Sequence, residues 1–214
     1  MSRTRVGVIG AGIAGPVAAM FLKQKGYDPV LYERLDSPSN AGLSIGYVSS
    51  LLPPPAAARS PPSSIQWNGL VVLSKIPGLL EYIDGNQVDE FHFYSVLPED
   101  LGLLGVSDHF RRHREATGFG TVGVERPLLQ NRLVEFAQKL DIPVNFGYKL
   151  ENLEQTEDGV TVTFANGVKE AFSFVVGCDG LHSNTRSCLF GETPADYTGV
   201  SQVRLCSSWL SWSS

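Results

Sequence analysis

The most informative part of the sequence is "VGVIGAGIAGPVAAMFLKQKG", residues 6–26. It opens with a short apolar run of strand length, and glycines then follow at positions 10, 12 and 15 in the order GxGxxG. Apolar residues at helical spacing come next, and Gly26 is of the type that ends helices. We therefore expect a buried strand, a tight glycine turn and a helix.

Each glycine has its own task in such a turn. Gly10 permits the tight turn, Gly12 lets backbone amides approach a pyrophosphate, and Gly15 allows the helix to pack closely against the strand. The first turn of the helix then offers unpaired N–H groups and the positive end of its dipole to the phosphates. Glycine-rich turns are common, so the motif gains its weight from what surrounds it.

The segment "DPVLYER" supplies that context, because it predicts a second strand that ends at Glu33. An acid there suits the ribose hydroxyls of an adenosine moiety and would repel the 2′-phosphate of NADP. The sequence therefore favours NAD or FAD at this site. The alternative is a structural turn with a surface glutamate. We interpret Arg34 as a solvated charge beside the strand end.

Composition limits the other possibilities. The chain has 214 residues, 43% hydrophobic and 18% charged, which is typical of a soluble globular protein, and its net charge of −5 argues against nucleic-acid binding. Three cysteines without a CxxC pair indicate neither a disulfide framework nor a zinc site. The uncharged stretch 6–22 could pass for a signal peptide, but it is too short and glycine-rich for a membrane span. We expect a cytoplasmic protein.

Residues 47–64, "YVSSLLPPPAAARSPPSS", interrupt this pattern. A run rich in proline and serine cannot build a core, and a long structureless loop is unusual inside a compact domain. We interpret the segment as an insertion derived from a translated intron. A genuine surface insertion is the alternative, because long loops cost little free energy.

The rest of the chain mixes helical and strand patterns. Residues 109–120, "HFRRHREATGFG", place His109 and His113 four residues apart, but no third metal ligand is evident, so a solvated basic loop is favoured and no metal is expected. The run "ERPLLQNRLVEFAQKL" predicts an amphipathic helix, and Arg126 near its start is either a surface charge or a cofactor contact. Asn166-Gly167 predicts a hairpin turn.

The stretch "FVVGCDGLHSNTR", residues 174–186, reads as a buried strand that ends in a glycine turn and a polar segment. Ligands of α/β sheets sit at the carboxyl ends of the strands. Asp179, His182 and Ser183 are the residue types of a hydrolase triad, but neighbours in one turn rarely reach triad geometry and no GxSxG is present. Cys178 is interpreted as a small core residue.

Taken together, the GxGxxG turn, Glu33, Arg126 before a helix and this last segment resemble the flavoprotein monooxygenases of the p-hydroxybenzoate hydroxylase type, most closely those of fungal secondary metabolism. In that family a segment of the form GxDGxxSxxR lies beside the cofactor; here it is filled by Gly177, Asp179, Gly180, Ser183 and Arg186. The resemblance implies that Asp179 helps to position FAD, that the segment takes part in NADPH docking, and that Gly46 lies near the flavin.

The implied fold class is α/β, a Rossmann-like FAD/NAD(P)-binding fold with a partial β-rich substrate domain. The resemblance assigns residues 1–80 and 119–187 to the FAD-binding domain, with 81–118 and 188–214 as an incomplete substrate domain. The family has a further motif, Gly-Asp followed by small residues, that holds the flavin ribityl chain and pyrophosphate. No such motif follows residue 187, so the chain resembles the amino-terminal half of a monooxygenase.

The resemblance also implies a reaction. NADPH, a transient reductant, reduces FAD, and a flavin hydroperoxide hydroxylates or epoxidises a small organic substrate. No catalytic residue is identified, and we expect a chain of this length to be weakly active or inactive. A non-catalytic nucleotide-binding remnant and an NAD-dependent reductase with a single Rossmann unit are the alternatives.

Overall fold

The computed structural model describes residues 3–38, 62–95, 97–192 and 196–199. The chain forms two compact units. The first unit comprises Met1–Ala41 and Leu129–Thr198, and the second comprises Gly42–Leu128 and Gly199–Ser214. Assigning either unit to a cofactor domain or a substrate domain, with the boundaries expected from the sequence, stays a prediction.

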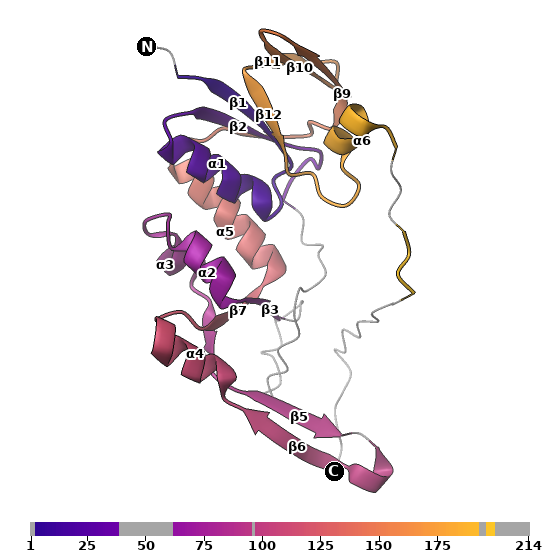
Figure 1. The fold of residues 1–214 in the computed structure, drawn as a ribbon. Helices are drawn as coiled ribbons and strands as arrows, with labels where there is room; N and C mark the ends of the chain where they lie inside the picture. Colours follow the sequence, from indigo (N-terminus) through magenta and orange to yellow (C-terminus); the bar gives the residue numbers. More distant parts are fainter. Residues whose placement is uncertain (1–2, 39–61, 96, 193–195, 200–214) are drawn as a thin grey trace. The chain divides into compact units, whose positions relative to one another are not determined.

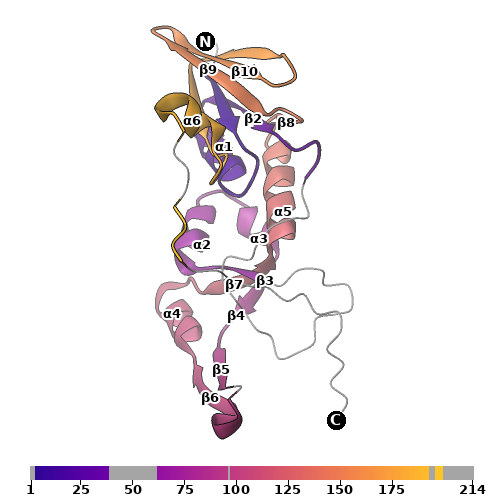
Figure 2. The same ribbon diagram turned by 90° about the vertical axis from the view of Figure 1, so that its right-hand side faces the viewer.

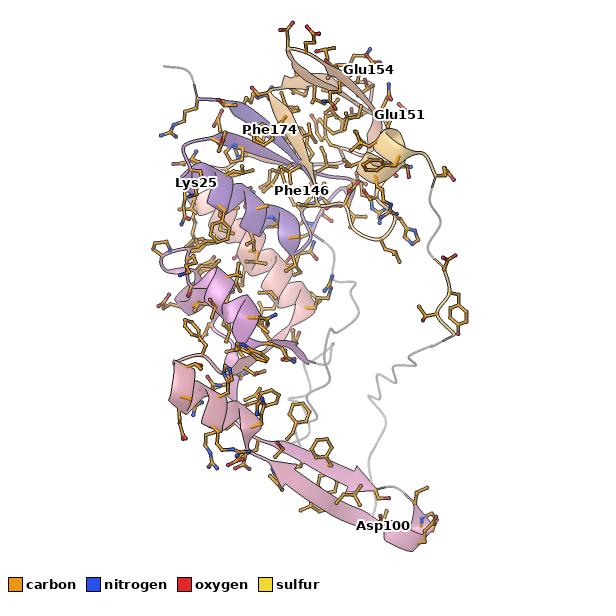
Figure 3. The ribbon with its side chains drawn as sticks, in the orientation of Figure 1. Lys25, Asp100, Phe146, Glu151, Glu154 and Phe174 are labelled. Carbon is orange, nitrogen blue, oxygen red and sulfur yellow. The ribbon has the colours of Figure 1, made fainter. Side chains whose placement is uncertain are left out.

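A four-stranded parallel sheet organises the first unit. Its strands are β1 (Arg5–Ile9), β2 (Asp28–Glu33), β8 (Val144–Phe146) and β12 (Phe174–Gly177), in the order β12-β1-β2-β8. The helix α1 (Ala14–Gln24) connects β1 to β2, and the chain leaves it through Gly26 at φ +88°. The predicted strand, glycine turn, helix and strand are all confirmed. Figure 3 labels Phe174 of β12 and Phe146 of β8, which belong to the two outer strands.

Both faces of this sheet are covered, which explains why β1 and β2 are nearly continuous apolar runs. Figure 1 draws α1 and α5 (Arg126–Lys139) on one side of the sheet and three antiparallel strands on the other. Met20 of α1 and Leu133 of α5 are fully buried. The predicted amphipathic helix after residue 125 is confirmed as α5.

The antiparallel strands are β9 (Leu150–Thr156), β10 (Gly159–Phe164) and β11 (Lys169–Phe172), in the order β11-β10-β9. Gly167 turns the β10–β11 hairpin at φ +83°, where the sequence predicted it. The hydrophobic core lies between the two sheets, where the Tyr32 ring stacks on Phe164 with centroids 4.6 Å apart. The buried members of this cluster are Ile9, Val30, Tyr32, Leu150, Val162, Phe164 and Phe172. Helix α6 (Asn184–Phe190) follows β12.

The second unit holds two small antiparallel sheets, seen from the side in Figure 2. One contains β3 (Pro62–Ile65), β7 (Thr121–Glu125) and β4 (Asn86–Val88) in the order β3-β7-β4. The other is the hairpin of β5 (Phe91–Ser95) and β6 (Gly102–Ser107), joined through a short 3₁₀ turn at Pro98–Asp100. Its helices are α2 (Trp67–Leu73), α3 (Leu79–Ile83) and α4 (His109–Thr117).

The structure corrects the prediction of a solvated loop at residues 109–120, because most of this segment forms α4. Asp108, which precedes the helix, accepts from Arg111 at 2.8 Å and pairs with Arg112 at 2.9 Å. The hydrogen bond from Arg111 lowers the pKa of Asp108, so the carboxylate stays charged against the helix. Arg114 pairs with Asp89. These ion pairs offset the repulsion within a basic run that looked unfavourable for a helix.

The end of the proline-rich segment takes part in a sheet. Ser63 lies opposite Val124 and Ser64 opposite Gly123 in the pairing of β3 with β7. Excision of residues 47–64 would remove three of the four residues of β3, so this pairing argues against an intron with that boundary and favours a genuine insertion. Residues 47–61 lie outside the described residues.

Candidate cofactor-binding site

The glycine turn begins where β1 ends, and its first glycine is required by the chain itself. The Gly10 N–H donates to the Tyr32 carbonyl at 2.7 Å, and Gly10 adopts φ +101°. A Cβ at this position would stand 2.6 Å from the Cys178 carbonyl oxygen and 2.9 Å from the Asp179 Cα. Only glycine satisfies both the torsion angle and this close approach. The turn after β1 and the turn after β12 therefore lie side by side.

The other two glycines differ in what surrounds them. A Cβ on Gly15 would overlap the Gly10 carbonyl oxygen, so the third glycine allows α1 to approach the turn closely. A Cβ on Gly12 would meet nothing within 4 Å. Gly12 therefore faces open space, which is what a site for an external group requires.

The N-terminus of α1 opens beside Gly12 without a side-chain cap. The N-cap residue is Ile13, which cannot accept a hydrogen bond from the first-turn amides, and no acidic residue occupies the first turn. Unpaired amides at the positive end of a helix dipole attract anions. The open space, the glycine turn and the uncapped helix together fit a pyrophosphate.

Glu33 ends β2 with its side chain turned toward the glycine turn. It is only 8% exposed, and its Oε2 accepts from the Ala11 N–H at 2.8 Å. Its Oε1 accepts from the Leu35 N–H at 3.1 Å. A carboxylate oxygen can accept more than one hydrogen bond, so each oxygen keeps capacity for a ligand hydroxyl. Glu33 thus joins the end of β2 to the turn and can also accept hydrogen bonds from a ribose.

Sequence reasoning missed a second side chain at this turn. Gln130 of α5 donates from Nε2 to the Ala11 carbonyl at 3.0 Å. Ala11 is fully buried, and side chains satisfy both polar groups of its backbone: Glu33 accepts from the N–H and Gln130 donates to the carbonyl. The sequence feature that could have indicated this contact is the position of Gln130, a polar residue beside the apolar stripe of the predicted helix.

Asp179 closes the turn that follows β12. Its Oδ1 accepts from the Ser183 hydroxyl at 2.6 Å. Its Oδ2 accepts from both the N–H and the hydroxyl of Thr185, at 2.9 and 3.0 Å. Ser183 in turn caps α6 by accepting from the Arg186 N–H at 3.0 Å. The carboxylate therefore fixes the passage from β12 into α6.

These contacts leave no hydrolase triad in this turn. The Ser183 hydroxyl donates directly to Asp179, and His182 is exposed to solvent. Cys178 is half-buried, and burial, with a smaller effect of the Asp179 charge, raises the pKa of its thiol. A thiol held protonated is a poor nucleophile.

The remaining expected site residues are not brought to this turn by the described contacts. Gly46 lies outside the described residues, and Arg126 begins α5 within the second unit. Their cofactor roles stay predictions. Over residues 3–38, 62–95, 97–192 and 196–199, no group of three or more His, Cys, Asp or Glu could hold a metal ion. In the same ranges, no helix is long and apolar enough to cross a membrane.

Comparison with known protein families agrees with this geometry. Residues 98–210, more than half of the 214 residues, match the family described as the FAD binding domain. The chain belongs to this FAD-binding family. Residues 8–47, which contain the glycine turn and Glu33, match the family described as the NAD(P)-binding Rossmann-like domain.

The curated proteins that the chain resembles include several monooxygenases. The chain is 28% identical over 208 residues to kynurenine 3-monooxygenase of Candida albicans, covering 92% of this chain and 41% of that protein. It is 31% identical over 196 residues to a flavin-dependent monooxygenase of an unknown prokaryotic organism, with coverage of 86% and 42%. An FAD-dependent monooxygenase of Aspergillus nanangensis, nanF, is 26% identical, with coverage of 90% and 38%. The chain spans about two fifths of the length of these relatives.

Solved structures give the same picture of the fold. HpxO of Klebsiella pneumoniae, crystallised with FAD and uric acid, superposes with a TM-score of 0.70 at 24% identity, covering 90% of this chain and 43% of that one. The tetracycline destructase Tet(51) gives a TM-score of 0.57 at 25% identity, with coverage of 88% and 42%. The predicted Rossmann-like α/β fold, the resemblance to flavoprotein monooxygenases and FAD as the family's cofactor are thereby confirmed.

Proposed function

We propose that this chain is the cofactor-binding part of an FAD-dependent monooxygenase that oxidises a small organic substrate. The observation that supports this most is the arrangement at the glycine turn. Glu33 holds the Ala11 amide, Gly12 faces open space, and α1 begins without a cap. In a member of the FAD-binding family, that arrangement suits the ADP half of FAD.

In this proposal the pyrophosphate binds the amides of Gly12 and of the first turn of α1. The adenosine ribose donates its hydroxyls to the spare acceptor positions of Glu33. A 2′-phosphate would meet the negative charge of the same carboxylate, so this site selects FAD over NADP. NADPH then acts as a transient reductant without a Rossmann unit of its own.

We further propose that Asp179 acts on the flavin through the turn it closes. Both of its oxygens already accept hydrogen bonds from Ser183 and Thr185, so its main effect is to fix the backbone after β12. That turn touches Gly10. Arg126, one helical turn ahead of Gln130 on α5, contacts the cofactor in this proposal, and Gly46 lies near the flavin.

Bound FAD supplies the redox chemistry, accepting a hydride from NADPH and activating O₂. The residues of this chain bind and orient the ADP half. A role in secondary metabolism, which the resemblance in the sequence implies, is part of this proposal. A cytoplasmic location is part of the same proposal.

Ligand titration tests the assignment. The 214-residue chain is titrated with FAD, FMN, ADP and NAD, and binding is followed by flavin fluorescence or calorimetry. We expect FAD and ADP to bind and FMN, which lacks the AMP part of FAD, to bind far more weakly. NAD binding that is tighter than FAD binding would favour the single-Rossmann reductase instead. Absence of binding by both FAD and ADP would refute the proposal.

A further inference from the structure

The Ala11 residue in the middle of the glycine turn is held from two sides. Its N–H donates to Glu33 Oε2 at 2.8 Å, and its carbonyl accepts from Gln130 Nε2 at 3.0 Å. Ala11 is 0% exposed, so neither group can be satisfied by bulk water. The two side chains come from different elements, the end of β2 and the helix α5. The peptide planes on both sides of Ala11 are therefore fixed.

The second of these peptide planes joins Ala11 to Gly12. In a trans peptide the C=O and the following N–H point in opposite directions. Because Gln130 draws the Ala11 carbonyl toward α5, the Gly12 N–H must point away from α5. None of the hydrogen bonds found among the described residues uses this N–H. Gly12 is also the glycine whose surroundings are open.

We infer that Gln130 is a positioning residue for the pyrophosphate of the cofactor. It acts through the Ala11 peptide, whose orientation determines where the Gly12 N–H points. The inference rests on the proposed function, because it assumes a dinucleotide at the glycine turn. It assigns a role to a side chain that never touches the ligand.

The role predicts a specific pattern of affinities. Without the Gln130 donor, the Ala11 peptide can rotate and the Gly12 amide is no longer fixed on the phosphate. Ligands that contain the pyrophosphate should lose affinity. Adenosine, which carries only the ribose and base, should keep its affinity because Glu33 is unchanged. A side chain that merely stabilised the fold would weaken both classes of ligand alike.

The test compares Gln130→Met with wild type in binding to ADP and to adenosine. Methionine keeps the length of the side chain and removes the donor. Gln138→Met is the matched control, because Gln138 lies on the same helix and is exposed. We expect Gln130→Met to weaken ADP binding about five- to tenfold, the effect of one neutral hydrogen bond. Adenosine binding should change less than about twofold, and Gln138→Met should change neither.

A spectroscopic readout separates positioning from folding. In ¹⁵N-labelled protein, ADP should shift the Gly12 amide resonance strongly in wild type and much less in Gln130→Met. If Gln130→Met does not fold by circular dichroism, Gln130→Leu serves instead, since it also lacks a donor and adds no charge near the pyrophosphate. Equal losses for ADP and adenosine, or unchanged ADP affinity, would overturn the role of Gln130. Failure of wild type to bind ADP would instead refute the proposed function, and this inference with it.

Discussion

Replacing Glu33 with glutamine should destabilise the apo protein as well as weaken FAD binding. The two carboxylate oxygens accept from two backbone amides, at Ala11 and Leu35. Glutamine is nearly isosteric but has only one acceptor oxygen. Its NH₂ group must therefore face one of the two N–H donors, and that donor loses its partner.

The magnitude follows from the two contacts. A hydrogen bond to a charged group contributes about 1.5–3 kcal/mol, and a buried donor left unsatisfied costs about 1–3 kcal/mol. These estimates overlap, because both describe the loss of the same bond. We therefore expect Glu33→Gln to lower the free energy of unfolding by about 1.5–3 kcal/mol, a large share of the 5–15 kcal/mol that is typical of a domain.

Urea denaturation of the apo protein, followed by circular dichroism, measures this effect without any cofactor. Glu157→Gln is the control, because Glu157 is exposed in the turn between β9 and β10. A loss below about 0.5 kcal/mol for Glu33→Gln, equal to the control, would mean that the two amide contacts do not hold the turn. FAD affinity, measured on the folded fraction, should fall in the same variant because a ribose acceptor is lost.

Other changes separate the roles of neighbouring residues. Gly15→Ala should destabilise the fold by more than about 2 kcal/mol in urea, because its Cβ overlaps the Gly10 carbonyl. Gly12→Ala should leave stability within about 1 kcal/mol and still weaken ADP binding in calorimetry, since its Cβ enters open space. Asp179→Asn should lower the melting temperature and reduce the helicity of α6, because asparagine cannot accept all three hydrogen bonds. Burial, followed by the Glu170 charge, raises the pKa of Tyr32 to about 12, above its unfolded value near 10. The unfolded state therefore loses this proton first, and stability falls as the pH rises from 10 to 12; between pH 8 and 11, wild type should lose about 1 kcal/mol more than Tyr32→Phe.

Local pattern was sufficient for the part of the fold that builds the site. A strand, the spacing of three glycines, a helix and an acid at the end of the next strand are all written in consecutive residues. The strand β12 also followed from an apolar run that ends in a turn, although its parallel pairing with β1 did not. Each of these features depends on sequence periodicity or on glycine torsion angles, which a single sequence reveals directly.

Contacts between residues far apart in the sequence could not be predicted from local pattern. Gln130 is separated from Ala11 by 119 positions, and nothing in the helix pattern indicates its target. Helix α4 was missed because its basic run is compensated partly by Asp89, a residue outside the segment. The strand β3 was missed because its pairing with β7 overrides a composition that disfavours strands. In each case a tertiary partner decides the local structure.

Some positions of this site are constrained by folding and others by cofactor binding, so substitutions can separate the two requirements. Gly10 and Gly15 lie against the chain's own atoms, so they are constrained by folding whether or not a cofactor binds. A Cβ on Gly12 would meet no atom within 4 Å, so nothing in the part of the chain that the structure describes requires glycine there. Glu33 belongs to both groups, because its contacts to backbone amides leave acceptor capacity for a ligand. Stability and cofactor affinity should therefore fall together in variants of Glu33 and separately in variants of Gly12. Loss of stability in Gly12→Ala as large as in Gly15→Ala would contradict this division, because it would mean that the second glycine is also required by the chain.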